Sequence, residues 1–126
     1  MSQRPVVVGL LLCESLIVEE GTHNVTLVNC FTTRKAEQFP SEPHRFTAFA
    51  VLTNGLGEVT IDVTIEHLED YGEVYRQSRR LRFTDPLQEV RFILRITQCS
   101  FPTAGAYEIN LSADGESLAA HRFQVW

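Results

Sequence analysis

The sequence predicts an all-β protein built as an antiparallel two-sheet β-sandwich of about eight strands. Turn residues recur roughly every ten positions, as they do in sandwiches and barrels. The segments between these turns alternate or run apolar and are rich in β-branched and aromatic residues, which favour strands. No stretch longer than a single turn has the 3.6-residue period of an amphipathic helix.

The chain is expected to form one domain spanning residues 1–126. A chain of this length buries about two-thirds of its unfolded surface without disulfide or metal staples. No internal repeat or low-complexity linker divides it. With 44% hydrophobic and 21% charged residues, the composition is that of a globular chain that folds by itself.

The first half of the chain is expected to hold three strands, at residues 5–13 with an extension over 16–18, at 25–32, and at 45–53. The loop 20–24 contains glycine and asparagine and returns the first strand into the second as a hairpin. A polar, proline-bearing loop follows at 34–44. Gly55 and Gly57 then supply the positive φ angles that the next reversal needs.

The fourth strand and the hairpin after it are assigned a register. Val59, Ile61, Val63 and Ile65 alternate with polar residues, so one face is buried and the other is wet. A three-residue loop at 70–72, with Gly72 in the left-handed conformation, places Glu69 opposite Glu73. The pairs that follow join opposite charges and join apolar residues: Asp62 with Arg80, Glu66 with Arg76, Ile61 with Leu81, and Val59 with Phe83.

Three more strands complete the expected sandwich. A turn at 84–86 precedes a strand in which Val90, Phe92, Leu94 and Ile96 share one face. Residues 107–112 alternate again. The dipeptide at 114–115, Asp-Gly, is a strong hairpin signal and leads into the last strand at 117–126.

The segment 101–107, Phe-Pro-Thr-Ala-Gly-Ala-Tyr, resembles the corner before the penultimate strand of immunoglobulin-like and fibronectin-like sandwiches. In those folds the tyrosine, here Tyr107, hydrogen-bonds an upstream backbone group. The resemblance implies an immunoglobulin-like sandwich.

A second resemblance covers nearly the whole chain through short motifs at residues 11–14, 18–22, 39–40, 105–107 and 123–125. With these motifs the chain resembles a family of small bacterial all-β domains of unknown function. The resemblance implies no catalytic residue.

The net charge and the cysteines indicate which binding partners and which cellular compartment to expect. The net charge of −5 repels phosphate backbones, so nucleic acid is not an expected partner. Three cysteines without C-x-x-C spacing suit reduced, buried thiols in a cytoplasmic protein. The apolar run 6–13 has one preceding cation and is short for a signal peptide, so it is interpreted as a strand. No stretch is long enough to span a membrane, and no membrane association is expected.

No group of residues predicts catalysis or metal binding, so the protein is expected not to be an enzyme and to use no cofactor. The four histidines have none of the spacings that place two imidazoles on one metal. No G-x-S-x-G turn announces a nucleophile. The carboxylates between Glu58 and Glu73 are better explained by cross-strand pairing with arginines than by a calcium site.

Two strands are apolar on both faces, which predicts a contact surface. The outward residues Val7, Leu11, Phe49 and Val51 cannot all be covered by a two-layer sandwich. The covering element is the loop 34–44, a symmetric copy or another protein, with the loop favoured. Trp126 lies on the outward parity of the last strand and is expected to anchor such a contact.

A second surface is basic. Arg76, Arg79, Arg80 and Arg82 lie close together in sequence and form a possible contact for an anion or an acidic partner. Arg91 and Arg95 extend that surface if they share it. Arg79 alternates in step with the core-facing residues of its strand. It therefore either extends its charged end to solvent at the sandwich edge or is turned outward by a bulge.

These features favour a non-enzymatic protein-interaction or assembly domain that binds a protein partner or a second copy of itself. The alternative is a small-ligand or carbohydrate-binding module that uses loops at one end of the sandwich. Its candidate residues are in the end loops, such as His23 with His44, Tyr71 or Phe101.

Overall fold

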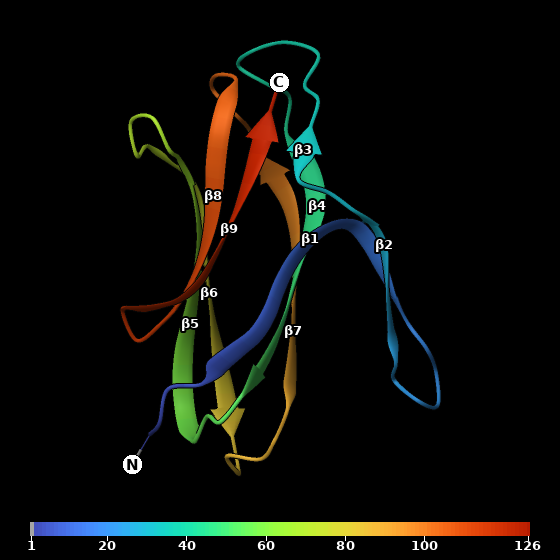
Figure 1. Ribbon diagram of the computed structural model, residues 1–126, viewed down its shortest axis with the longest axis vertical. Helices are drawn as coiled ribbons and strands as arrows, with labels where there is room; N and C mark the ends of the chain where they lie inside the picture. Colours follow the sequence, from blue (N-terminus) through green and yellow to red (C-terminus); the bar gives the residue numbers. More distant parts are fainter. Residues whose placement is uncertain (1) are drawn as a thin grey trace.

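Within the part of the chain that the structure describes, nine strands form two sheets that pack face to face (Figure 1). The computed structural model describes residues 2–126. In chain order the strands are β1 (Val6–Val18), β2 (Val25–Cys30), β3 (Thr33–Arg34), β4 (His44–Thr53), β5 (Gly57–His67), β6 (Glu73–Phe83), β7 (Val90–Cys99), β8 (Gly105–Ala113) and β9 (Glu116–Val125). The four-stranded sheet has the order β2-β1-β4-β7, and the five-stranded sheet the order β3-β9-β8-β5-β6. The predicted all-β, two-sheet sandwich is confirmed, and the short β3 is an addition to the eight expected strands.

Alternating side chains on the inner faces of the sheets build the core. On β4 these are Phe46, Ala48, Ala50 and Leu52, and on β5 they are Val59, Ile61, Val63 and Ile65. Each of these residues is buried, whereas the residues between them on β5 are half-buried or exposed. Burial of one large apolar side chain contributes about 1.5–3 kcal/mol. Burial in the core therefore determines which face of each of these strands points inward.

The predicted β5–β6 register is wrong by two residues. Ile61 lies opposite Arg79, and Val59 opposite Leu81. The connection between the strands spans residues 68–72, and Tyr71, with φ of 59°, takes the left-handed position assigned to Gly72. A bulge after Ile65 adds a further shift. Because a shift of two keeps every side chain on its face, the inward and outward sets stay as predicted.

The tyrosine corner is confirmed. The Tyr107 hydroxyl donates to the Thr103 carbonyl at 2.6 Å. Gly105 makes this corner possible, because its φ is 141° and a Cβ there would lie 2.9 Å from Nε2 of His67. His67 is buried against the Tyr107 ring and accepts a hydrogen bond at Nδ1 from the Glu69 backbone N–H. It serves as a packed core histidine.

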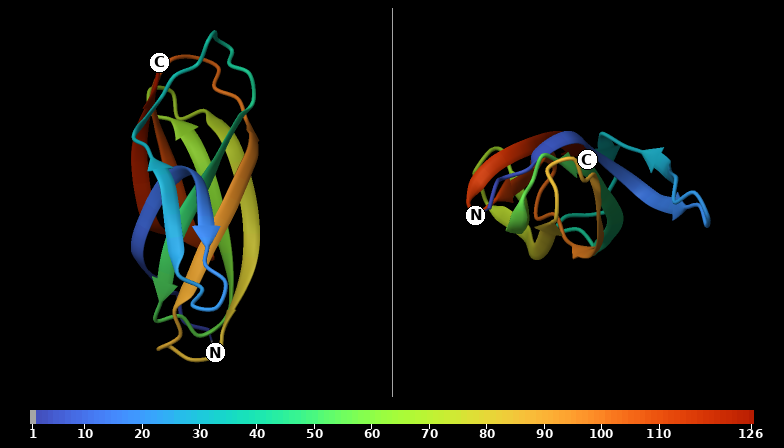
Figure 2. Two further views of the ribbon diagram at one scale, coloured as in Figure 1. Left: turned by 90° about the vertical axis from the view of Figure 1, so that its right-hand side faces the viewer. Right: turned by 90° about the horizontal axis from the view of Figure 1, so that it is seen from below.

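Between β2 and β4 the chain crosses from one sheet to the other. β3 runs parallel to the end of β9, with Thr33 opposite Gln124. The following loop closes one end of the sandwich, since the Ser41 backbone N–H donates to the Phe101 carbonyl and the Phe101 N–H to the Ser41 hydroxyl. Figure 2 shows the loop at that end. The expectation that this loop covers the outer face of β1 and β4 is therefore wrong.

Candidate functional site

The most distinctive feature of the fold is a two-stranded arm, residues 14–30, that leaves the sandwich. β1 pairs with β4 only as far as Cys13, which lies opposite Thr47. Beyond that point, Ser15 to Val18 pair with β2 alone. Figures 1 and 2 show the arm projecting from the side of the sandwich. The polar dipeptide Glu14-Ser15, which interrupts an otherwise apolar run, marks the place where the arm begins.

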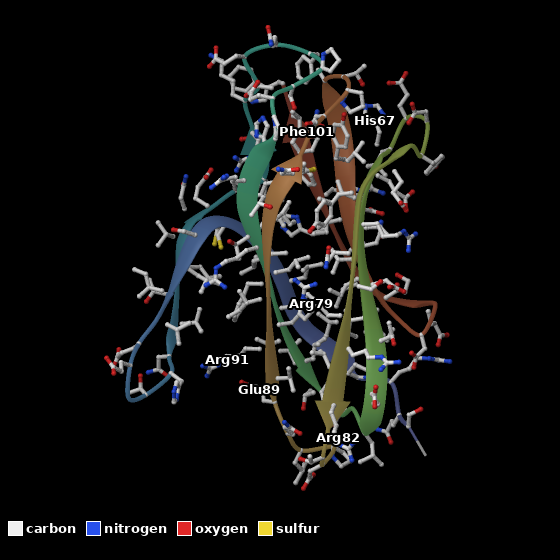
Figure 3. The ribbon with its side chains drawn as sticks, turned by 180° about the vertical axis from the view of Figure 1, so that it is seen from behind. His67, Arg79, Arg82, Glu89, Arg91 and Phe101 are labelled. Atoms are coloured by element: carbon white, nitrogen blue, oxygen red, sulfur yellow. The ribbon has the colours of Figure 1, made fainter. Side chains whose placement is uncertain are left out.

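The arm has two faces of different exposure. One face carries the half-buried Leu16, Val25 and Leu27, and the other carries the exposed Ile17 and Val28. At the arm tip the His23 carbonyl accepts a hydrogen bond from the Arg91 guanidinium of β7, and Figure 3 shows Arg91 between β7 and the arm. The arm thus leans toward the four-stranded sheet and leaves the Ile17 face open to solvent.

Three of the five predicted contact residues lie on the outer face of the four-stranded sheet. Leu11 is exposed, and Phe49 and Val51 are half-buried on that face. The outward placement of Val7 is wrong, because a bulge between Val7 and Gly9 turns Val7 toward the core, opposite the buried Leu52.

Trp126 lies on a different surface. Its backbone N–H donates to the Arg34 carbonyl, so the residue extends the edge of the five-stranded sheet beside β3. The indole is 60% exposed, with the Lys35 ammonium 5.3 Å from the ring centroid. Trp126 therefore does not join Leu11 and Phe49 in one patch.

At the base of the arm, Arg34 forms a polar cluster that the sequence did not reveal. Its guanidinium donates to Glu14 of β1 at 2.8 Å, to Nδ1 of His44 at 3.2 Å, and to the Arg45 carbonyl at 3.3 Å. The rings of Phe31 and Phe46 lie 4.6 and 5.0 Å from the guanidinium carbon. The side chain is only 11% exposed. Arg34 thus ties together the arm, β3 and the start of β4.

The hydrogen bond from Arg34 determines which ring nitrogen of His44 carries the proton. Because Arg34 Nε–H donates to Nδ1, the proton of the neutral imidazole is on Nε2, which is buried and has no hydrogen-bond partner within residues 2–126. Glu42 Oε1 lies 3.5 Å from Nε2. Burial lowers the pKa of His44, and the Arg34 charge lowers it further. The folded state therefore disfavours the protonated imidazole.

We expect the stability of the domain to fall as the pH falls through the ordinary histidine range, in part because of His44. The unfolded chain takes up a proton there that the folded chain does not bind, so the free energy of unfolding decreases. Urea unfolding at pH 7.5 and 5.5 should show a smaller decrease for His44→Gln than for the wild type. His23→Gln, at the exposed arm tip, is the matched control and should keep the wild-type decrease. An unchanged decrease in His44→Gln would contradict the assignment.

The predicted basic surface on β6 is partly neutralised. Arg76 pairs with Glu73 at 2.8 Å and Arg80 with Glu58 at 3.3 Å. Arg79 and Arg82 have no carboxylate partner within residues 2–126. Arg79 has the inward parity but is exposed, because β6 is the edge strand of its sheet (Figure 3). Its guanidinium donates to the Ser78 carbonyl at 3.3 Å.

Arg91 and Arg95 do not extend the β6 surface. They lie on β7, in the other sheet, and their neighbours across the strand pair are Val51 and Thr47. β6 and β7 are consecutive in sequence, but the connection between them crosses from one sheet to the other. The basic residues therefore form two separate surfaces.

The loop residues predicted for ligand binding do not converge. His23 is at the arm tip near Arg91, whereas His44 lies opposite Cys99. Arg91 and Cys99 are eight residues apart on β7, which is about 26 Å at the usual rise. Phe101 is fully buried. In residues 2–126 no group of three histidine, cysteine or acidic side chains is arranged to hold a metal.

The three cysteines are free thiols in different settings. Cys13 and Cys30 lie directly opposite each other where the arm begins, with Cys13 buried and Cys30 exposed. Burial raises the pKa of Cys13, and so does the neighbouring Cys30. Burial raises the pKa of Cys99 to about 12. Cys99 is thus an inert core thiol.

Comparison with known proteins identifies a family but no activity. A model of a family of unknown function, DUF6941, matches residues 9–126. No curated protein matches the chain. Among solved structures, the chain is similar to Pseudomonas fluorescens alkylpurine DNA glycosylase AlkC bound to DNA containing an abasic site analog. The TM-score is 0.51 and the identity 12%, over 75% of this chain and 27% of that chain. The chain thus spans about a quarter of the glycosylase, and the likeness concerns the fold alone.

Among residues 2–126, no helix is long and apolar enough to cross a membrane.

Proposed function

The chain belongs to the DUF6941 family of unknown function. We propose that it is a non-enzymatic interaction domain that binds another protein chain through the arm. The exposed apolar residues carry the proposal. Of the nine large apolar side chains exposed in residues 2–126, six lie on β1 and β2. Three of them are in the arm, namely Ile17, Val18 and Val28, and three precede it on β1, namely Val6, Val8 and Leu11. Such a concentration of apolar surface is typical of contact sites.

The shape of the arm supports a protein partner. A two-stranded ribbon is marginally stable by itself and gains from packing against a further layer. One face of the arm leans toward the sandwich, and the Ile17 face has no covering element within residues 2–126. β2 is also an edge strand, so its free backbone groups can add a strand of the partner.

The charges favour protein over nucleic acid. The AlkC structure contains DNA, but this chain has a net charge of −5, and two of the four β6 arginines are paired with carboxylates. DNA affinity depends on neutralising many phosphates with cations. We therefore propose no nucleic-acid role.

The free cysteines bear on the cellular compartment, and the tyrosine corner bears on the fold class. Free cysteines, two of them with raised pKa, are consistent with a reducing, cytoplasmic compartment and offer no activated nucleophile. The tyrosine corner supports assignment to the immunoglobulin-like sandwiches. Bacterial origin stays a prediction.

The proposal predicts that charge on the open face of the arm abolishes association. Ile17→Asp and Val28→Asp each place a carboxylate where an apolar contact forms, which should weaken binding by about tenfold or more. Sedimentation velocity at increasing concentration measures self-association, and affinity purification from the native host measures binding to another protein. Leu87→Asp, a charge at an exposed apolar residue of the β6–β7 loop, is the matched control and should bind like the wild type.

Two results would count against the proposal. One is that the arm variants keep the association state and the copurifying proteins of the wild type. The other is a wild-type chain that stays monomeric at high concentration and retains no protein.

A further inference from the structure

A hollow of about 230 Å³ lies where the arm leaves the four-stranded sheet. Glu14 and Ser15, the first residues of the arm, form one wall. The start of β4 and the end of β7 form the rest of the lining. The core residues Phe46 and Ile96 also line it. The hollow is open to solvent and has an apolar part. Because Glu14 and Ser15 line it, it adjoins the arm.

Two arginines give this hollow a positive charge. Arg45 and Arg95 both line it, and neither guanidinium has a carboxylate or hydrogen-bond partner within residues 2–126. The single lining carboxylate, Glu14, already accepts a charged hydrogen bond from Arg34 at 2.8 Å. Because that ion pair neutralises Glu14, the two arginines determine the net charge of the site.

Hydroxyl groups stand beside the arginines. Ser15, Thr47 and Thr97 line the same hollow. Thr47 is only 5% exposed. The site thus offers charged and neutral donors to one bound group.

We propose that this hollow binds the carboxylate of an acidic peptide segment supplied by the protein partner. The inference rests on the proposed function, because the arm brings the partner to this place. Guanidinium groups match carboxylates in a bidentate geometry. The apolar part of the hollow suits the methylenes of a glutamate side chain. Inorganic phosphate fits less well, because it has no methylene groups to occupy the apolar part of the hollow.

The experiment titrates the full chain with blocked tetraglutamate, its glutamine analogue and inorganic phosphate, followed by amide NMR. Tetraglutamate should shift the Thr47 and Thr97 amides in a saturable way, and added salt should weaken the binding. Arg45→Gln and Arg95→Gln should each weaken it by about tenfold. Arg82 lies on the five-stranded sheet, is exposed and has no carboxylate partner within residues 2–126. Arg82→Gln is therefore the matched control and should leave the affinity unchanged.

The inference is overturned if the glutamine peptide or phosphate binds as tightly as tetraglutamate, or if the arginine variants bind it normally. Failure of the inference is distinguishable from failure of the proposed function. If Ile17→Asp abolishes the association while Arg45→Gln and Arg95→Gln preserve it, the hollow has no role and the arm remains the contact surface. If neither class of variant changes the association, both proposals fail.

Discussion

Replacing Arg34 by alanine is expected to lower the free energy of unfolding by about 3 kcal/mol. The substitution removes the donor to Glu14 and leaves the buried Nδ1 of His44 without a partner. It also removes the cation between the Phe31 and Phe46 rings, where each contact contributes about 0.5–2 kcal/mol. Because the arm has few other ties to the sandwich, the loss should also loosen the arm. Urea unfolding measures the first effect, and hydrogen exchange in β2 measures the second.

Two variants test whether burial of the cluster causes this loss. Arg76→Ala breaks an ion pair with the same 2.8 Å distance to Glu73, but its side chain is 57% exposed and the pair is screened by water, so we expect a much smaller loss of stability than for Arg34→Ala. Arg34→Lys keeps the charge but loses the fork that reaches His44 and the Arg45 carbonyl, so it should recover less than half of the stability. Equal losses for Arg34→Ala and Arg76→Ala would contradict the structural role of the cluster.

The strands were predictable because their signal is local. The alternation in β5 and the apolar row of β4 each depend on neighbouring residues of one segment, and both sets lie in the core. The β5–β6 register was less accessible, because it depends on whether Tyr71 or Gly72 takes the left-handed conformation. Because a slip of two residues keeps every side chain on its face, the alternation along β5 does not distinguish the predicted register from the observed one.

The candidate site was less predictable because tertiary contacts create it. The apolar run of β1 predicts a strand, but only the pairing with β4 shows that the strand leaves the sheet after Cys13. Arg34 lies at the start of a polar loop, and nothing local indicates that it is buried. Likewise Arg45 and Arg95 are fifty residues apart and meet only through the β4–β7 pairing. The sequence therefore placed the anion contact on β6, where the arginines are neighbours along the chain.

Oxidation is expected to join Cys13 to Cys30 and to raise the free energy of unfolding by about 3 kcal/mol, the chain-entropy value for a loop of this length. Leu12 and Phe31 form the adjacent hydrogen-bonded pair, with the Phe31 N–H donating to the Leu12 carbonyl at 3.0 Å. Cys13 and Cys30 therefore occupy a non-hydrogen-bonded pair. Such pairs have Cα atoms about 4.5 Å apart, within the range that disulfides span.

The chemistry favours an attack that begins at Cys30. Its exposed thiolate adds to the azo group of diamide, and the Cys13 thiolate then attacks the Cys30 sulfur and releases the reduced hydrazide. The two thiol hydrogens pass to the reagent. Because burial raises the pKa of Cys13, the second step should be faster at alkaline pH.

Intact mass and a peptide map identify the bond, and urea unfolding of the oxidised chain measures its stabilisation. Cys30→Ser should prevent both the intramolecular link and the added stability. Cys99 should stay a thiol throughout, because it is fully buried and its pKa is raised to about 12. If oxidation yields only Cys30-linked dimers, Cys13 does not face Cys30. The arm would then leave the sandwich in a different register, and the walls of the Arg45 and Arg95 hollow would move with it.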